Sequence, residues 1–381
     1  MKIFLITSTR ADFGLLKNLI FEFKKNSYFD LKIIATGTHF SKKHGFSFSE
    51  IKNYKVEIYK KILITNSTRS PTSLLNDMSL LSKRISSLIK ADKPDLFIVL
   101  GDRYEIFAVS LAAYISKIPI AHIHGGEITQ GSLDDGFRHC ISKISNLHFV
   151  SHKNYKRRLV KMGENPKSIY NVGALGVENI YKTDFLNKEE LEKFLKINLK
   201  KNILIVCLQP EVSKKLTINL VNETLSALKY CSDKSIVFTM PGADLYNDII
   251  FKKILIFKRK NFNCFLFKNL GSQKFLSFLK ISDAIIGNSS SGIIEMPTFK
   301  KPTINIGDRQ KGRVKSNSII DVLPKTSLIK KKINFLYSRK FKNKNIINPY
   351  KKLNTSKKII SIIKNINLEK YKNKKFYDIF N

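Results

Sequence analysis

Short apolar segments alternate with amphipathic segments along almost the whole chain. In the first half, the apolar segments are four to seven residues long and rich in Ile, Leu, Val and Phe, which is typical of strands buried in a sheet. They predict strands at residues 2–7, 31–36, 96–100, 118–124 and 147–150. Between them, apolar positions recur at helical spacing, for example over 11–24 and 72–90. Strands that alternate with helices predict a parallel α/β sheet.

A second series of the same kind follows a stretch at residues 172–184, whose two glycines and mixed polarity are typical of a linker. This series predicts strands at 203–208, 235–240, 264–267, 283–287 and 302–307. The sequence therefore predicts two α/β domains, residues 1–175 and 176–349. Residues 350–381 contain a helical pattern, and we expect this C-terminal helix and tail to pack back on the body of the protein.

Polar residues follow the predicted strands directly. They occupy residues 7–10, 37–39, 101–103, 122–127, 209–211 and 288–292. In doubly wound sheets, ligands bind outside the carboxyl ends of the strands. Two such edges that face each other make a central cleft between the domains, which is a usual place for a small polar ligand.

The chain has 68 basic and 30 acidic residues, a net charge of +38. A surplus of this size is typical of nucleic-acid-binding proteins. Only 11 of the basic residues are Arg, however, and Arg is the residue that reads base edges with paired hydrogen bonds. The lysines accompany Ile, Asn and Phe throughout, so we interpret the charge as a solvated surface and expect no nucleic-acid partner.

The sequence lacks the features of zinc-binding, disulfide-rich, membrane and secreted proteins. Its four cysteines have no CxxC spacing, which argues against a zinc site or a disulfide framework. No apolar run reaches the roughly 18–20 residues that a membrane span needs, and the first residues do not resemble a signal peptide. We therefore expect a cytoplasmic protein with no membrane partner.

The segment GNSSSG at 287–292 precedes an apolar stretch that predicts a helix. Its hydroxyls and the N–H groups at a helix start suit a phosphate, although a simple N-cap would explain one serine. Glu295, about one turn later, can accept both hydroxyls of a ribose, or it is an ordinary first-turn acid. Arg10, Arg309 and Arg313 are candidates to bind a pyrophosphate from loops of the two halves. Neither a Walker loop nor a GxGxxG fingerprint occurs, so we expect no dinucleotide cofactor.

Three acids, Asp102, Glu127 and Asp134, follow strands of the first half. Three carboxylates at one edge cannot all ionise freely, so at least one pKa should rise toward neutrality, as general acid–base catalysis requires. Arg103, Arg138 and nearby histidines would moderate the repulsion, and a purely structural salt-bridge network is the alternative. We expect no metal ion here, because the HxHGGE spacing falls at a strand end.

Taken together, these segments resemble the hydrolysing UDP-N-acetylglucosamine 2-epimerases, in particular their bacterial sialic-acid branch. The resemblance covers nearly the whole chain. It is carried by TSTRADFG (7–14), VLGDRYEIF (99–107), HIHGGEIT (122–129), DDGFRHCISKISNLHFV (134–150), RRLVKMGENPKSIYNVGALG (157–176), IIGNSSSGIIEMP (285–297) and TINIGDRQKGRV (303–314).

The resemblance implies two Rossmann-like domains facing a central cleft, the GT-B-like arrangement. It implies conversion of UDP-N-acetylglucosamine and water to N-acetylmannosamine and UDP through a 2-acetamidoglucal, in sialic acid biosynthesis. It implies no cofactor and no metal, a nucleotide-sugar as the small-molecule partner, and a homodimer or homotetramer.

The resemblance also assigns roles by motif position. The first domain would carry the acid–base residues and the second would bind the nucleotide. Asp102, Glu127 and Asp134 match the catalytic acids, and His39 matches a histidine that contacts substrate. Arg103, His124 and Arg138 lie beside the acids in the motifs. On the nucleotide side the matching residues are Arg10, Ser289, Ser290, Glu295 and Arg309, with Arg313 nearby.

One departure concerns Gln209. The family usually has a His-Pro pair where this chain has Gln209 and Pro210. An amide can bind a phosphate or a sugar hydroxyl but cannot transfer a proton.

Three alternative functions stay open beside the UDP-N-acetylglucosamine 2-epimerase. They are an epimerase of a nucleotide-linked 2,4-diacetamido sugar in legionaminic acid synthesis, a GT-B glycosyltransferase, and a binding protein without turnover.

Overall fold

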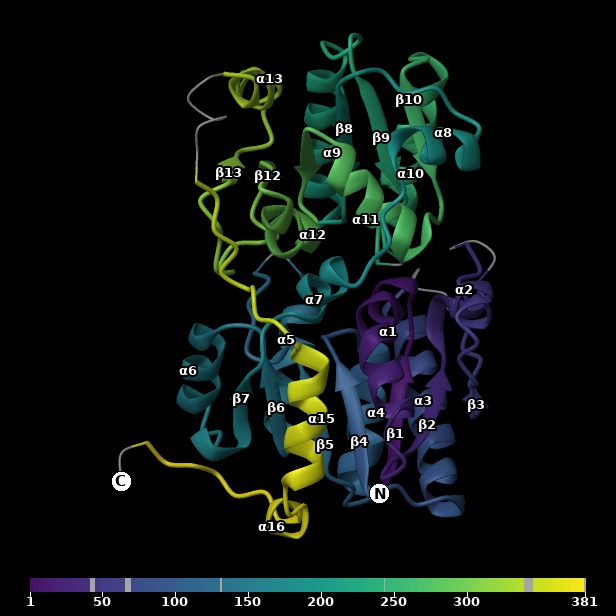
Figure 1. Cartoon of the computed structure of the whole chain (residues 1–381), viewed down its shortest axis with the longest axis vertical. Helices are drawn as coiled ribbons and strands as arrows, with labels where there is room; N and C mark the ends of the chain where they lie inside the picture. Colours follow the sequence, from purple (N-terminus) through teal and green to yellow (C-terminus); the bar gives the residue numbers. More distant parts are fainter. Residues whose placement is uncertain (42–44, 66–69, 131, 243, 339–344, 380–381) are drawn as a thin grey trace. The chain divides into compact units, whose positions relative to one another are not determined.

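The computed structural model describes residues 1–381 except 42–44, 66–69, 131, 243, 339–344 and 380–381. The chain forms two compact units (Figure 1). Unit 1 comprises Met1–Glu127, Leu133–Asn179 and Tyr350–Asn381, and unit 2 comprises Ile128–Ser132 and Ile180–Pro349. The domain boundaries expected from the sequence, and the cleft between the domains, stay predictions.

Unit 1 is built on a seven-stranded parallel sheet with the strand order β3-β2-β1-β4-β5-β6-β7. The five strands predicted for this half are present: β1 (Lys2–Thr7), β2 (Asp30–Ala35), β4 (Leu96–Leu100), β5 (Ile120–Ile123) and β6 (Leu147–Val150). The edge strands β3 (Lys60–Lys61) and β7 (Ile169–Asn171) were not predicted. Two or three residues are too few to show a hydrophobic pattern.

The helices of unit 1 include the two predicted by periodicity, now bounded as α1 (Arg10–Lys24) and α3 (Pro71–Ala91). The segment interpreted as a linker contains a helix, α7 (Leu175–Tyr181), and the two units meet in sequence within that helix. The other helical elements are η1 (Gly37–Phe40), α2 (Phe48–Asn53), α4 (Tyr104–Ile115), α5 (Asp134–Ile144), α6 (Lys153–Lys161), η3 (Pro166–Ser168), α15 (Thr355–Asn365) and α16 (Glu369–Lys372).

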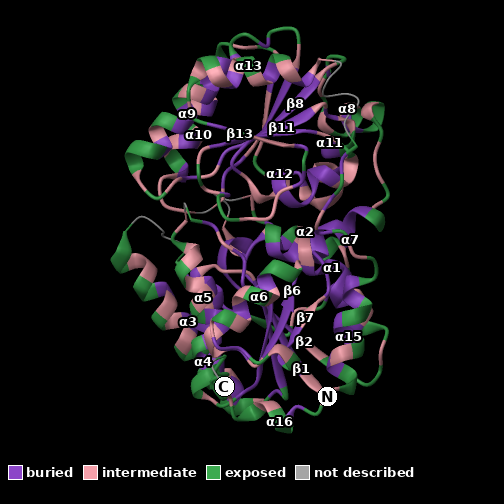
Figure 2. Ribbon diagram, turned by 90° about the vertical axis from the view of Figure 1, so that its left-hand side faces the viewer, coloured by how far each residue is buried: buried purple, intermediate pink, exposed green. Residues whose placement is uncertain are grey.

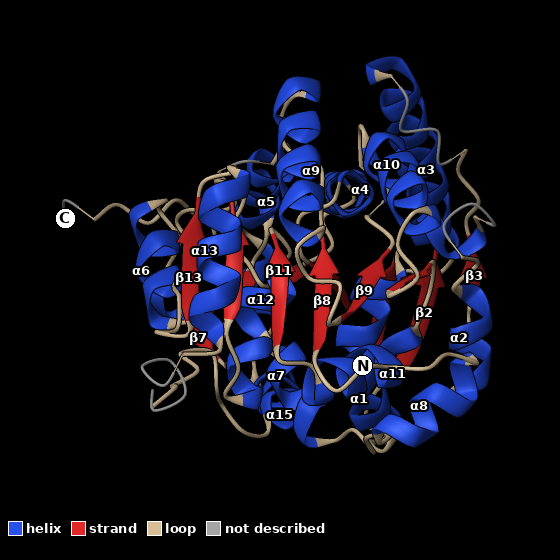
Figure 3. Cartoon of the chain, turned by 90° about the horizontal axis from the view of Figure 1, so that it is seen from above, coloured by secondary structure: helices blue, strands red, loops and turns tan. Residues whose placement is uncertain are grey.

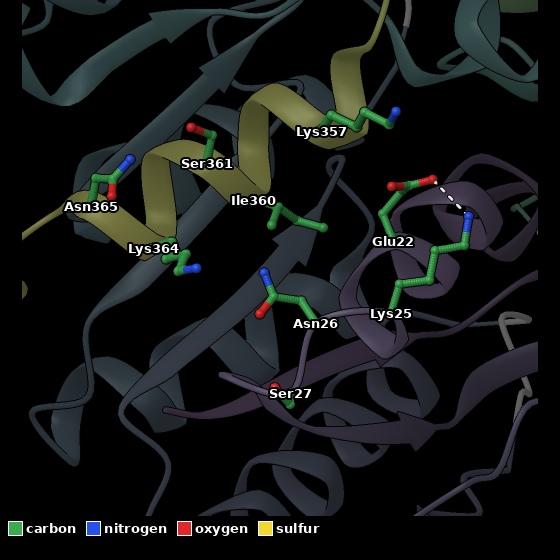
Figure 4. A pocket seen from close by; sticks show the side chains of 9 residues that line it. All are labelled: Glu22, Lys25, Asn26, Ser27, Lys357, Ile360, Ser361, Lys364 and Asn365. Carbon is green, nitrogen blue, oxygen red and sulfur yellow. Dashed lines mark hydrogen bonds and ion pairs between the residues drawn. The ribbon is translucent and has the colours of Figure 1, made fainter.

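The C-terminal helix α15 packs on unit 1. Its Ile359, Ile360 and Ile363 belong to the same apolar cluster as Leu16 and Ile20 of α1. A pocket of about 420 Å³ lies beside this contact (Figure 4). It is lined by Glu22 of α1, by residues 25–27 that follow this helix, and by residues of α15. Within it, Lys25 forms an ion pair with Glu22 at 3.3 Å. This pocket is at the opposite end of α1 from Arg10, so it is not part of the candidate site described below.

Unit 2 contains a six-stranded parallel sheet with the order β10-β9-β8-β11-β12-β13. The five predicted strands are β8 (Ile203–Cys207), β9 (Ser235–Thr239), β10 (Cys264–Phe267), β11 (Ala284–Gly287) and β12 (Thr303–Ile306), and β13 (Ile319–Val322) was not predicted. Its helices are α8 (Lys188–Leu195), α9 (Lys214–Leu228), α10 (Asn247–Arg259), α11 (Gly271–Ile281), α12 (Ser290–Ile294), η4 (Met296–Phe299) and α13 (Thr326–Leu336).

The central strands of both sheets are buried, whereas the helices expose their outer sides (Figure 2). Helices lie on both sides of the strands (Figure 3). Parallel strands covered on both faces explain why the sequence shows continuous apolar runs and no alternating pattern. Because all strands of a sheet run in one direction, the loops that follow them gather at one edge. None of the helices in the described ranges is long and apolar enough to cross a bilayer.

Candidate active site

The loop after β1 is fixed by the buried carboxylate of Asp12. The carboxylate accepts hydrogen bonds from Ser8 N at 2.9 Å and Thr9 N at 3.0 Å, and also from the hydroxyls of Thr7 and Ser8. In return, Thr9 caps α1 by accepting from Asp12 N at 3.2 Å. This capping box fixes the backbone that leads into Arg10, the first residue of α1. Asp12 was not among the predicted site residues, although the Thr-x-x-Asp spacing is typical of a capping box.

His39 lies in η1, after β2, and is fully buried. Its Nε2 lies 2.9 Å from the Thr7 hydroxyl, and its Nδ1 lies 2.9 Å from the Ser47 hydroxyl. Burial lowers the pKa of His39, while the nearby Asp12 opposes that shift. Both ring nitrogens therefore contact hydroxyls of the protein, and the contact of His39 with substrate stays a prediction.

Asp102 follows β4 and lies on a fixed loop. Gly101 adopts a φ of +85°, and its carbonyl accepts a hydrogen bond from His122 Nε2 at 2.7 Å. Burial lowers the pKa of His122 to about 3, so its ring is neutral at pH 7. Because a carbonyl can only accept, Nε2 carries the ring proton, and Nδ1 accepts from the Ser142 hydroxyl at 3.1 Å. The loop carrying Asp102 is thus anchored to β5 and α5.

The Asp102 carboxylate accepts a hydrogen bond from Nη2 of Arg138, on α5. The Arg138 side chain is buried, and its Nη1 also lies 3.8 Å from Asp135. Asp134 begins the same helix one turn before Arg138, so the two residues occupy one side of α5. The structure therefore brings Asp102 and Arg138 together, with Asp134 on the same helix as Arg138.

Glu127 follows β5, the neighbour of β4, and is 1% exposed. Its Oε1 accepts a hydrogen bond from the Ser151 hydroxyl at 2.7 Å and lies 2.8 Å from His124 Nδ1. His124 adopts a φ of +67°, a backbone conformation that few residues other than glycine take. Its Nε2 is buried and has no hydrogen-bond partner among the described residues. The described residues therefore leave the hydrogen-bonding capacity of this ring nitrogen unsatisfied.

Arg103 forms an ion pair with an acid that the sequence analysis missed, Glu105. Glu105 is fully buried at the start of α4, and burial raises its pKa while Arg103 opposes the shift. From the sequence, both Arg103 and Arg138 were expected to balance the charges of the three candidate acids. Arg138 balances the charge of Asp102, whereas Arg103 forms its ion pair with Glu105.

Except for Arg10, the nucleotide-side candidates belong to unit 2. There, the buried Asn288 joins the loops after β8, β11 and β12. Its Oδ1 accepts from Gln209 N at 2.7 Å, and its Nδ2 donates to Gln209 O at 2.9 Å and to Glu211 Oε1 at 2.8 Å. Its carbonyl accepts from Gln310 Nε2 at 2.9 Å. Asn288 was not among the predicted site residues, since nothing local in the sequence reveals these four contacts.

Gln209, at the position where the resemblance implies a histidine, has a structural contact of its own. Its side-chain Oε1 accepts a hydrogen bond from Gly242 N at 2.8 Å, in the loop after β9. The side chain therefore links two neighbouring loops at the carboxyl edge of the sheet.

The serine segment begins α12, with Ser289 as the N-cap residue and Ser290 as the first helical residue. The Ser289 hydroxyl accepts from Ser291 N at 3.4 Å. α12 is only five residues long, and the buried Glu295 follows it as the C-cap residue. A helix this short has a small dipole, so the expected phosphate site depends on the serine hydroxyls and N–H groups.

Arg309 and Arg313 lie on the loop after β12. Arg309 Nη2 is 4.0 Å from Asp244, and its Nε has no partner among the described residues. Arg309 also lies near Glu211, whose pKa burial raises, while Asn288 and Arg309 oppose the shift. Gly312, beside Arg313, adopts a φ of +86°, and a Cβ there would lie 2.7 Å from a side-chain carbon of Ile128. Glycine is therefore required at this turn.

The predicted residues thus fall into two sets, one on each unit. Unit 1 holds Arg10, His39, Asp102, Arg103, His124, Glu127, Asp134 and Arg138, and unit 2 holds Gln209, Ser289, Ser290, Glu295, Arg309 and Arg313. Their roles in binding and catalysis stay predictions. Within the described parts of the chain, no three His, Cys, Asp or Glu side chains gather as metal ligands would.

The sequence model of a family described as UDP-N-acetylglucosamine 2-epimerase matches residues 22–364. The chain belongs to this family. A Campylobacter jejuni relative, GDP/UDP-N,N'-diacetylbacillosamine 2-epimerase (hydrolyzing), is 42% identical over 84% of each chain. The Escherichia coli polysialic acid biosynthesis protein P7 is 37% identical over 99% of this chain and 97% of its own.

Solved structures of the UDP-N-acetylglucosamine 2-epimerase family have the same fold. The Neisseria meningitidis UDP-GlcNAc 2-epimerase bound to UDP-GlcNAc superposes with a TM-score of 0.80 at 21% identity, over 96% of this chain and 100% of that one. The predicted family and the two GT-B-like parallel-sheet α/β domains are therefore confirmed.

Proposed function

We propose that this member of the family is a hydrolysing 2-epimerase that converts UDP-N-acetylglucosamine and water to N-acetylmannosamine and UDP. The observation that carries the proposal is the pair of carboxylates at the ends of the adjacent strands β4 and β5. Asp102 is held by Arg138, and Glu127 is held by Ser151 and His124. General acid–base catalysis needs such positioned carboxylates.

In the proposed first step, a carboxylate removes the proton from C2 of the sugar while the C1–O bond breaks. The electron pair of the C2–H bond forms the C1=C2 bond of a 2-acetamidoglucal, and UDP leaves with the pair of the C1–O bond. The C2 proton is not next to a carbonyl, so the departing diphosphate needs strong stabilisation. We assign this to Arg10, Arg309, Arg313, Ser289 and Ser290, with Glu295 on the ribose.

In the second step, the oxygen of water bonds to C1 and a proton returns to C2 on the opposite face of the ring. One water is consumed, and the configuration at C2 is inverted. Two acids on different loops suit this step, since one can remove a proton from one face while another delivers a proton to the other. Asp102, Glu127 and Asp134 supply these groups, and His39, Arg103, His124, Arg138 and Gln209 would orient the sugar and its phosphates.

A second candidate substrate is a nucleotide-linked N,N'-diacetylbacillosamine. The 42% identity with the Campylobacter jejuni enzyme favours it, whereas the near-complete coverage of the polysialic acid protein favours UDP-N-acetylglucosamine. Both sugars carry an acetamido group at C2 and would undergo the same elimination and addition. They differ at ring positions away from C2, so a direct comparison of rates distinguishes them.

Turnover in deuterated water tests the reaction and its substrate. With UDP-N-acetylglucosamine we expect UDP and N-acetylmannosamine carrying one deuterium at C2, as measured by NMR, because solvent supplies the returning proton. UDP together with unlabelled N-acetylglucosamine would instead mean simple hydrolysis. A kcat/KM at least about tenfold higher for the diacetamido substrate, a difference of about 1.4 kcal/mol in transition-state binding, would assign the chain to that sugar.

Gln209→His tests whether a proton donor has been lost in the second unit. Because the Gln209 side chain already links two loops through Gly242 N, we expect kcat to change by less than about threefold. A restored general acid would raise kcat by about a hundredfold, within the range usual for such groups. A rise of that size would show that the missing histidine limits this enzyme. Kd for UDP, measured by calorimetry, checks that the loop is intact.

A further inference from the structure

Arg103 and Glu105 form a paired hydrogen-bonded contact directly beside Asp102. Arg103 Nε donates to Glu105 Oε2 at 3.1 Å, and Arg103 Nη2 donates to Glu105 Oε1 at 3.3 Å. The two bonds use the same edge of the guanidinium, which fixes its plane as well as its position. The other edge, at Nη1, is therefore turned away from Glu105.

The Glu105 carboxylate is enclosed by neighbouring loops. A Cβ built on Gly37, in the loop after β2, would lie 3.2 Å from Glu105 Oε1 and 2.4 Å from the Ser8 carbonyl. Gly37 has a φ of +61°, so the backbone and the contact both require glycine. The side chain of Glu105 is 0% exposed, whereas that of Arg103 is 17% exposed. The carboxylate is thus fixed in the interior, and the guanidinium extends from it to the surface.

An ion pair with a buried carboxylate contributes little to the stability of a fold. Removing a carboxylate from water costs several kcal/mol, and a buried ion pair often stabilises a fold no more than apolar side chains of the same volume would. A function in substrate binding explains the pair better. Arg103 follows Asp102 in the sequence, and the buried Glu105 holds its guanidinium near the end of β4. An unrestrained arginine side chain carries about 2 kcal/mol of rotamer entropy, which must be lost when it binds a substrate.

We propose that Glu105 is a positioning residue, which fixes the Arg103 guanidinium for the substrate beside Asp102. The inference rests on the proposed function, in which Arg103 binds the nucleotide-sugar. We assign Glu105 itself no contact with substrate, because both of its carboxylate oxygens accept hydrogen bonds from Arg103. Its effect on turnover passes through Arg103.

A double-mutant cycle tests this dependence. We expect Arg103→Gln and Glu105→Gln each to lower kcat/KM by about 30- to 100-fold, since a misplacement of about 1 Å can cost a hundredfold. The double variant should be no more than about threefold worse than the poorer single variant, because both changes remove the same interaction. Losses that multiply in the double variant, or an E105Q enzyme with more than half the wild-type kcat/KM, would overturn the proposal.

Glu164→Gln is the matched control, because Glu164 is another buried carboxylate of unit 1. It contacts His148 at 3.0 Å and Lys143 at 3.1 Å and lies outside the candidate site. We expect its loss to lower the melting temperature while kcat/KM stays within about twofold of wild type. If E105Q does not fold, Glu105→Asp keeps the charge but shortens the side chain by one methylene. The double variant of Glu105→Asp and Arg103→Gln should then be no more than about threefold worse in kcat/KM than the poorer single variant.

A second measurement does not depend on turnover. The Arg103 Nε–H resonance, identified by its absence in Arg103→Gln, should exchange slowly with solvent in the wild type and rapidly in Glu105→Gln. An unchanged exchange rate would contradict the inference. If no nucleotide-sugar is turned over, the proposed function fails, whereas this resonance still decides whether Glu105 holds Arg103.

Discussion

Glu127→Gln is expected to lower kcat by about three orders of magnitude, within the range that general acid–base groups contribute. Glutamine has nearly the same shape, and its amide oxygen can still accept from the Ser151 hydroxyl, which now lies 2.7 Å from Oε1. The loop should therefore keep its conformation, while the side chain can no longer take up or deliver a proton. Asp102→Asn should act in the same way, because the amide oxygen can still accept from Arg138.

The nucleotide provides the internal control for these variants. Both acids lie on unit 1, whereas the residues assigned to the diphosphate lie on unit 2 except for Arg10. We therefore expect Kd for UDP, measured by calorimetry, to stay within about threefold of wild type, a change of under 1 kcal/mol. Variants that both keep more than a tenth of the wild-type kcat would refute the acid–base assignment. A large loss of UDP binding would point to a distorted fold.

Asn288→Ala is expected to lower the free energy of unfolding of unit 2 by about 3–5 kcal/mol. The change removes three side-chain hydrogen bonds, to Gln209 N, Gln209 O and Glu211 Oε1. Each buried polar group left without a partner costs about 1–3 kcal/mol. The same loops carry residues assigned to the diphosphate, so Kd for UDP should rise by at least about tenfold. Urea unfolding and calorimetry measure the two effects.

Asn263→Ala is the matched control for Asn288→Ala. Its Nδ2 also donates two hydrogen bonds, to Cys231 O at 3.0 Å and Lys234 O at 2.7 Å, but it precedes β10 and so lies at the amino end of that strand. We expect it to lower stability without changing Kd for UDP. Equal losses of UDP affinity in both alanine variants would show that Asn288 acts only through general stability.

Much of the fold could be predicted because a parallel sheet leaves a simple trace in the sequence. Strands buried on both faces appear as short apolar runs, and all ten predicted strands occur in the structure. The three missed strands, β3, β7 and β13, are two to four residues long and lie at or near sheet edges, where burial is incomplete. Their pattern is too short to separate from a loop.

The serine segment at residues 287–292 shows a different limit of prediction from sequence. The serines do begin a helix, as expected, but α12 ends after five residues and continues as the turn η4. Its length is set by Pro297 and by packing, including the hydrogen bond from Asn348 Nδ2 to the Ile294 carbonyl at 2.8 Å. A contact across more than fifty residues leaves no local signal.

By itself, the sequence determined the two sheets and the loops that carry the candidate chemistry. This follows from the period of the apolar runs and from the single direction of parallel strands, which are local or topological properties. Only the tertiary structure decided which partner each charged or polar side chain has. Asp102 pairs with Arg138, Arg103 with Glu105, and Asn288 joins Gln209 to Glu211. Such pairings depend on distances of a few ångströms, most of them between residues far apart in the chain, and residue types alone do not encode those distances.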